Sequence, residues 1–118
     1  MTQLEALKEL LEKVEAGNWG PFDGPSNETG LSDWCLDFDK IMLENSMDAA
    51  LSLFDAVLPG PNQFSVVTDP TCIKATVCFW PNGLSGKVEV HGEGWHEAIP
   101  ARALLIAILK AKIAELEA

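Results

Sequence analysis

The feature that most constrains the fold is an apolar segment near the end of the sequence. Residues 103–109 read Ala-Leu-Leu-Ile-Ala-Ile-Leu, and the stretch from Pro100 to about Glu115 predicts a helix, because proline suits a first helical position. Ile106 widens the arc made by the main apolar stripe, which consists of Leu104, Leu105, Ile108, Leu109, Ile113 and Leu116. A helix that is apolar around most of its circumference is buried on more than one side. Either a helix near the N-terminus covers the second side, or a second copy of the chain does so in a homodimer.

A second helix is predicted from Ser46, a residue type that caps helix N-termini well, to the break at 59–61, which reads Pro-Gly-Pro. Its apolar residues recur at helical spacing. They are Met47, Ala50, Leu51, Phe54, Val57 and Leu58.

Three strands are expected after this helix, at residues 64–68, 73–80 and 87–91. β-Branched and aromatic residues fill the second, and residues 81–83, Pro-Asn-Gly, favour a tight turn into the third. The resulting α-β-β-β-α order predicts a three-stranded antiparallel sheet packed by helices.

The first part of the sequence predicts an amphipathic helix over residues 1–17, which ends at Gly17. Residues 18–45 then form an acidic loop region broken by Gly and Pro, with one or two helical turns expected within 32–44. The prediction is a single α+β domain over residues 1–118: a helix, an irregular acidic segment and an α-β-β-β-α core over 46–118.

Charge is distributed unevenly along the chain. Residues 1–60 hold twelve Asp and Glu against three Lys, whereas residues 61–118 hold six acids against five bases. Such a negative field repels nucleic acid and anionic membranes and favours a basic protein partner. Double-stranded-RNA-binding domains share the α-β-β-β-α order but need Lys and Arg at the start of the last helix; here that region offers Arg102 beside Glu97.

The sequence also bears on the compartment. No apolar run approaches the roughly 18 residues of a membrane span, and the first residues do not read as a secretory signal. Three cysteines form no recognisable framework. We therefore expect a cytoplasmic protein with reduced thiols.

Residues 18–48 provide the candidate binding surface. Carboxylates recur there every two to five residues, interleaved with aromatic side chains. The predicted partner-binding residues are Trp19, Phe22, Asp23, Glu28, Asp33, Trp34, Asp37, Asp39 and Glu44. Three interpretations stay open: a protein-docking surface with aromatic anchors, an imitation of the charge pattern of DNA, and a solvated face whose aromatics point inward.

Residues 91–97, His-Gly-Glu-Gly-Trp-His-Glu, form the one cluster whose side chains suggest metal binding or catalysis. Their spacing fits no established zinc motif, so we interpret them as a strand-to-helix connection with two solvated histidines.

Carboxylates on either side of Cys35 disfavour a thiolate there. No catalytic residue, metal site or cofactor is predicted; an enzyme would need a deep pocket near His91 and His96.

Several segments together resemble the phage ABA-sandwich domain family. They are residues 10–16 (Leu-Leu-Glu-Lys-Val-Glu-Ala) with a later Gly-Pro, 46–51 (Ser-Met-Asp-Ala-Ala-Leu), 58–60 (Leu-Pro-Gly), 92–94 (Gly-Glu-Gly) and 99–101 (Ile-Pro-Ala) before the last helix. The chain differs from the family pattern at Phe64, where Trp is expected, and at Ile99, where Thr is expected. The resemblance implies a phage or prophage source and a bacterial host cytoplasm. The family has no established activity, so no functional residues carry over.

Together these observations predict a small acidic phage accessory protein that is not an enzyme and acts by binding protein. It would be an inhibitor or anti-defence protein that docks on a basic host protein. The alternative is a homo-oligomeric structural or assembly component of a phage, and a small-molecule enzyme is the third class.

Overall fold

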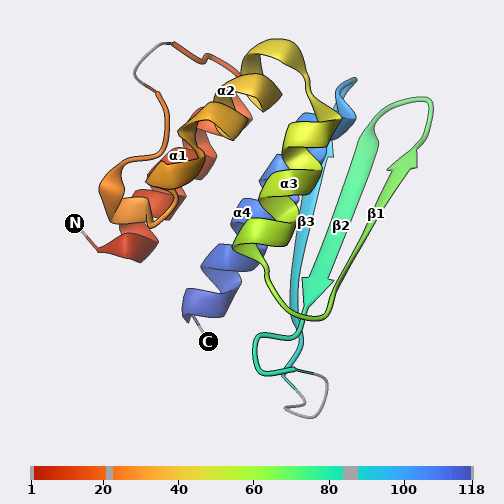
Figure 1. Cartoon of the computed structure of the whole chain (residues 1–118). Coiled ribbons are helices and arrows are strands. Elements are labelled where there is room, and N and C mark those ends of the chain that lie inside the picture. Colours follow the sequence, from red (N-terminus) through yellow and green to blue (C-terminus); the bar gives the residue numbers. More distant parts are fainter. Residues whose placement is uncertain (1, 21–22, 84–87, 118) are drawn as a thin grey trace.

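The computed structural model describes residues 2–20, 23–83 and 88–117 (Figure 1). It has an α+β fold, as the sequence predicts, with four α-helices, two 3-10 helices and a three-stranded antiparallel sheet in the described residues. The α-helices are α1 (Gln3–Ala16), α2 (Cys35–Glu44), α3 (Met47–Val57) and α4 (Pro100–Glu117). The strands are β1 (Asn62–Thr68), β2 (Ile73–Phe79) and β3 (Val90–His96), and the 3-10 helices are η1 (Asn27–Thr29) and η2 (Ser32–Trp34).

The expected ends of α1 and α3 are confirmed by their capping geometry. Gly17 closes α1 in the left-handed conformation, with φ of 78°, and its N–H bonds the carbonyls of Lys13 and Val14. The Ser46 side chain accepts a hydrogen bond from the N–H of Ala49 at the start of α3. Both ends therefore satisfy backbone groups that would otherwise lack a partner.

The segment 32–44 is more regular than the sequence predicts. After η2 the chain continues directly into α2, a helix of 10 residues that ends at Asn45, with φ of 57°. Phe38, Ile41 and Met42 are buried on one side of it, at the i, i+3 and i+4 spacing of an amphipathic helix. Burial of that stripe outweighs the weak local signal and orders the segment.

β3 lies further along the chain than expected. The prediction of a third strand at 87–91 is wrong, because β3 covers 90–96 and pairs Phe79 with Val90 and Ile73 with His96; Lys87 falls outside the described residues. Residues 91–96 are therefore strand rather than a strand-to-helix connection. β2 ends at Phe79 and β3 begins only at Val90, and Gly83 adopts the left-handed conformation expected of a turn residue; residues 84–87 fall outside the described residues.

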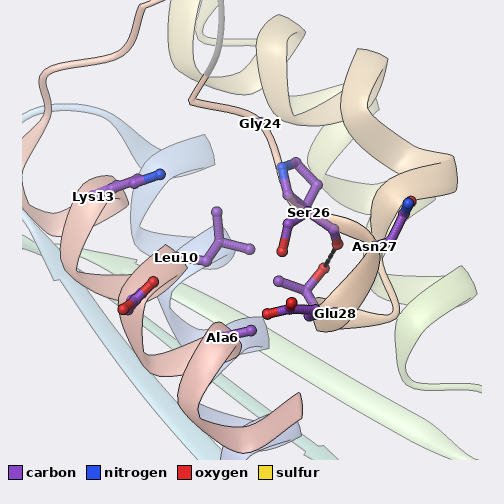
Figure 2. A pocket seen from close by; sticks show the side chains of 10 residues that line it. Ala6, Leu10, Lys13, Gly24, Ser26, Asn27 and Glu28 are labelled. Atoms are coloured by element: carbon purple, nitrogen blue, oxygen red, sulfur yellow. Dashed lines mark hydrogen bonds between the residues drawn. The ribbon is translucent and has the colours of Figure 1, made fainter. Parts of the chain in front are cut away.

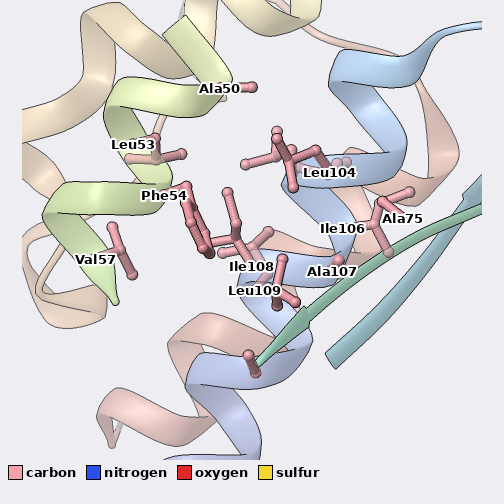
Figure 3. Packing of buried hydrophobic residues seen from close by; sticks show 14 of the residues in the cluster. Ala50, Leu53, Phe54, Val57, Ala75, Leu104, Ile106, Ala107, Ile108 and Leu109 are labelled. Atoms are coloured by element: carbon pink, nitrogen blue, oxygen red, sulfur yellow. The ribbon is translucent and has the colours of Figure 1, made fainter. Parts of the chain in front are cut away.

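α4 lies at the centre of the molecule, between the sheet on one side and α1 and α3 on the other (Figure 1). Leu53, Phe54 and Val57 of α3 face Leu104 and Ile108 of α4 (Figure 3). Ten residues of α4 are buried within this single chain. The N-terminal helix thus covers the second apolar side, and the observation that suggested a homodimer through α4 is explained without one.

The contact between β3 and α4 brings two backbones together. A Cβ at Gly92 would clash with the carbonyl oxygen of Ala107 and lie 2.6 Å from the amide nitrogen of Ala111. A Cβ at Gly94 would clash with the carbonyl oxygen of Ala103 and lie 2.6 Å from the amide nitrogen of Ala107. Glycine on the strand and alanine at every fourth helical position are therefore what allow this approach.

The opposite face of the sheet has no helix on it among the described residues (Figure 1). Alternate residues of β2 are buried against α4, and those between them are half-buried. β1 is an edge strand that carries no charged residue, and Phe64 and Val67 are exposed on it. No helix within the described ranges is long and apolar enough to cross a membrane.

His96 links the end of β3 to the start of α4. Its Nδ1 accepts hydrogen bonds from the N–H groups of Ala98 (3.0 Å) and Ile99 (2.9 Å), so the imidazole must be neutral at that nitrogen. Burial lowers the pKa of His96, the positive charge of Arg102 lowers it further, and Glu97 opposes the shift.

We predict that Gly92→Ala destabilises the fold by about 3 kcal/mol, because the atoms that a methyl group would meet belong to the α4 backbone and cannot rotate away. Urea denaturation followed by circular dichroism measures this. Glu93→Ala, an exposed position on the same strand, should leave the midpoint nearly unchanged. Equal midpoints for Gly92→Ala and wild type would contradict the close approach.

The second prediction concerns pH. An unfolded chain protonates His96 near its ordinary pKa of 6.5, whereas the folded chain resists protonation. The unfolded state therefore binds more protons as pH falls through 6.5, and the free energy of unfolding should decrease there until the lower folded pKa is reached. His96→Asn keeps a side-chain acceptor but does not titrate, so it should lose less stability than wild type between pH 7.5 and 5.5. In the control, His91→Asn, the wild-type decrease should persist.

Candidate protein-docking surface

The tryptophans expected as partner anchors pack on the domain. Trp19 donates from Nε1 to Oδ1 of Asp39 at 2.8 Å, and its ring stacks on Phe38 with centroids 6.3 Å apart. Trp34 is half-buried and also packs against the core. Phe22, the third predicted anchor, lies outside the described residues. For the two tryptophans the structure matches the interpretation in which the aromatics point inward.

Two of the predicted carboxylates make local contacts. Asp39 accepts the Trp19 hydrogen bond, and Asp23 accepts one from the N–H of Gly20 at 2.6 Å. Both side chains are half-buried. They tie Trp19 to α2 and Gly20 to Asp23, so a change at either carboxylate would disturb the fold as well as the surface.

Glu28 lies in a different part of the molecule. It lines a hollow of about 410 Å³ between α1 and residues 24–29, where Ala6 and Leu10 form part of the wall and Lys13 contributes a positive charge (Figure 2). The loop is held by a hydrogen bond from Oγ1 of Thr29 to the Ser26 carbonyl oxygen, at 2.6 Å. Glu28 is therefore separate from the carboxylates of α2.

The outer side of α2 presents two leucines to solvent. Leu36 is 66% exposed and Leu43 is 64% exposed. They stand at i and i+7, so they lie on the same face of the helix, with exposed Lys40 between them. Large aliphatic side chains exposed this far on a short helix are the strongest apolar feature of the acidic half.

Carboxylates lie along one side of these leucines, because Asp37 and Glu44 directly follow them on the helix. Asp37, Glu44 and Asp48 line a hollow of about 360 Å³ at the junction of α2 and α3, together with Lys40. Asp33, at the preceding η2 turn, is exposed. We call this surface the α2 face; it comprises Asp33, Leu36, Asp37, Lys40, Leu43, Glu44 and Asp48. Four carboxylates against one ammonium give the α2 face a net negative charge, and Lys40 lies between its two leucines.

The charge pattern of the sequence predicted Asp33, Asp37 and Glu44 in the candidate surface but did not indicate Leu36 and Leu43. The missing information was the helix itself. Once 35–44 is read as a helix with Phe38, Ile41 and Met42 inward, the two leucines are left on the opposite side. Two large apolar side chains on the side of the helix opposite its buried stripe are the signal that could have identified them.

The single arginine is used inside the domain. Arg102 donates from a terminal guanidinium nitrogen to the carbonyl oxygen of Met42 at 2.7 Å, near the C-terminal end of α2. A cation is favoured at that end of a helix. Among the described residues its Nε has no hydrogen-bond partner. The guanidinium group at the start of α4 is therefore engaged by the α2 backbone and is not presented to a phosphate.

The two histidines do not share a site. Position 96 is on the side of β3 that faces α4, whereas His91 lies on the open face and lines a hollow of about 220 Å³ with Gln63, Thr76 and Cys78. Burial, the Glu89 charge and a hydrogen bond to Glu89 raise the pKa of the Cys78 thiol. Among the described residues, the hollow that His91 lines does not include His96.

Comparisons with protein-family models, with curated proteins and with solved structures give no match to this chain. The class defined by fold and surface is an α+β domain with an acidic, leucine-centred helix face. The phage ABA-sandwich resemblance stays a prediction from sequence.

We predict that Leu36→Ser and Leu43→Ser change the free energy of unfolding by less than about 0.5 kcal/mol, because both side chains are already largely in water. Phe38→Ala, on the opposite side of the same helix, should cost about 3–5 kcal/mol, since Phe38 is fully buried. Urea denaturation of the three variants measures the difference. A large loss for either serine variant would show that the α2 face is covered.

Proposed function

We propose that the protein acts by binding a basic protein partner through the α2 face. The observation that carries the proposal is a pair of leucines exposed by more than 60% on a surface that also carries four carboxylates. A few well-packed residues near the centre of an interface supply most of its binding energy, and leucines that leave water there contribute through the apolar area they bury. Carboxylates at its edge steer a cationic surface into place and select against anionic ones.

The partner is expected to combine cationic rim residues with an apolar pocket for Leu36 and Leu43. If the family resemblance holds, it is a host or phage protein in a bacterial cytoplasm. Proteins that hold nucleic acid carry such basic surfaces, and carboxylates spaced along α2 would compete with phosphates for them. Inhibition of a nucleic-acid-handling protein is therefore the form of activity we propose.

The assembly alternative receives less support. It was motivated by the apolar last helix, whose buried residues are covered by α1, α3 and the sheet of the same chain. The α2 face offers a clearer surface than any part of α4. Self-association would appear in the experiment below as recovery of the protein alone.

The test begins with tagged protein expressed in its bacterial host. Copurified proteins are identified at low salt and at about 0.5 M salt, where charge interactions between exposed groups are strongly screened. We expect a basic partner that is retained at low salt and reduced at high salt. The same partner must then bind the purified protein directly.

Three variants locate the interface. Asp33→Asn/Asp37→Asn/Glu44→Gln removes three carboxylates of the α2 face, and Leu36→Ser/Leu43→Ser removes its apolar centre. Glu12→Gln/Glu15→Gln/Glu97→Gln removes the same charge from exposed positions elsewhere. We expect the first two to weaken binding at least tenfold and the third to leave it within about twofold. Equal effects of the two charge variants, or recovery of the protein alone, would contradict the proposal.

A further inference from the structure

The open face of the sheet brings together three side chains with different metal-binding atoms. They are Cys78 of β2, Glu89 just before β3, and His91 of β3. Their Sγ, carboxylate oxygen and imidazole nitrogen atoms all lie within 4.8 Å of one another. Glu89 Oε1 is 3.2 Å from His91 Nε2. We propose that these three side chains form a binding site for a single divalent zinc ion.

Strand pairing produces the site. Cys78 and His91 are opposite one another in the antiparallel ladder between β2 and β3, so their side chains project from the same face as direct cross-strand neighbours. Glu89 precedes His91 by two residues, which returns its side chain to that face. Cys78 and His91 are thirteen positions apart in the sequence, a spacing that matches no local motif.

The donor set suits zinc. Thiolate, imidazole and carboxylate are its three usual ligands, at bond lengths of about 2.0–2.3 Å. Tetrahedral geometry then requires ligand atoms about 3.3–3.8 Å apart. The Glu89–His91 separation is already this short, and the remaining approach to Cys78 needs only side-chain rotation, because Glu89 and His91 are 43% and 59% exposed. Softer thiolate coordination also disfavours Mg²⁺ and Ca²⁺.

The present surroundings are electrostatically unfavourable without a cation. The Glu89 carboxylate lies beside the Cys78 thiol, and two negative charges there would repel each other. A divalent cation between them reverses the sign of the interaction, since it attracts both groups. Cys72 has no such set: its thiol lies 3.7 Å from Asp69 Oδ2, with no third ligand in the described residues.

Two of the three proposed ligands, Cys78 and His91, also line the hollow of about 220 Å³, so that space is open next to the site. Three protein ligands with an open position are typical of zinc sites that hold a water or an external ligand atom, whereas structural sites are closed by four protein ligands. The inference is independent of partner binding, because no residue of the α2 face contributes to this site.

The experiment is a titration of the reduced, tag-free protein with Co²⁺, a coloured substitute for zinc, followed by competition with Zn²⁺. We expect one equivalent of Co²⁺ to produce a thiolate-to-cobalt charge-transfer band, which Zn²⁺ then displaces. Zn²⁺ should also raise the melting temperature, because it binds the folded state. Backbone amide shifts in an NMR spectrum should change around 78 and 89–91.

Matched variants decide whether the ligands are correct. Cys78→Ser and His91→Ala should each weaken zinc binding by about 100-fold. Loss of a residue that only hydrogen-bonds to a metal ligand weakens metal affinity by about 10–100-fold, and loss of a ligand itself should cost at least as much. Glu89→Gln should weaken it about tenfold. Cys72→Ser and Glu93→Gln change a thiol just before β2 and a carboxylate on β3, and both variants should bind zinc as wild type does.

Two outcomes would overturn the proposal. One is the absence of a charge-transfer band at micromolar to millimolar Co²⁺. The other is zinc binding that Cys78→Ser leaves unchanged, which would assign the metal to scattered surface carboxylates. Circular dichroism and urea midpoints confirm that each variant is folded, since all five positions face away from the core or are not fully buried.

Discussion

The close approach of β3 to α4 is the constraint on which the rest of the fold depends. Gly92 and Gly94 let the strand backbone lie directly against alanines of the helix, with no space for even one methyl group between them. This contact brings α4 down onto the sheet, so that its other side is left for α1 and α3. Larger residues on the strand would lift the helix away and open the core. Interiors packed this tightly tolerate little change in volume.

The same glycines explain why sequence reasoning located β3 incorrectly. Glycine is poor in strands by propensity, and the segment 91–97 therefore reads as a connection. Elements whose limits are set by local chemistry were predicted well: Gly17 ends α1, Ser46 begins α3 and Pro100 begins α4. β3 and α2 depend instead on what packs against them, which the residues near them in sequence do not indicate.

The candidate surfaces show the same division. The negative charge of the acidic half follows from composition, but its arrangement depends on the helical phase of α2, which directs Phe38 inward and Leu36 outward. The sequence left open whether Trp19 faces a partner or the core, because its hydrogen bond to Asp39 joins positions twenty residues apart. Cys78 and His91 meet only through the register of two strands. Local patterns thus predict which residue types are available, and tertiary pairing determines which of them form a site.

The central position of α4 has a consequence for how the chain folds during its synthesis. Every element that α4 touches precedes it in the sequence, so α1, α3 and the sheet leave the ribosome before the helix that joins them. Their apolar sides stay exposed to chaperones and to neighbouring chains until residues 100–117 emerge. Folding should therefore occur late and in one step, with little stable structure in shorter nascent chains. The negative charge concentrated in residues 1–60 would meanwhile help to keep such unfinished chains apart by mutual repulsion.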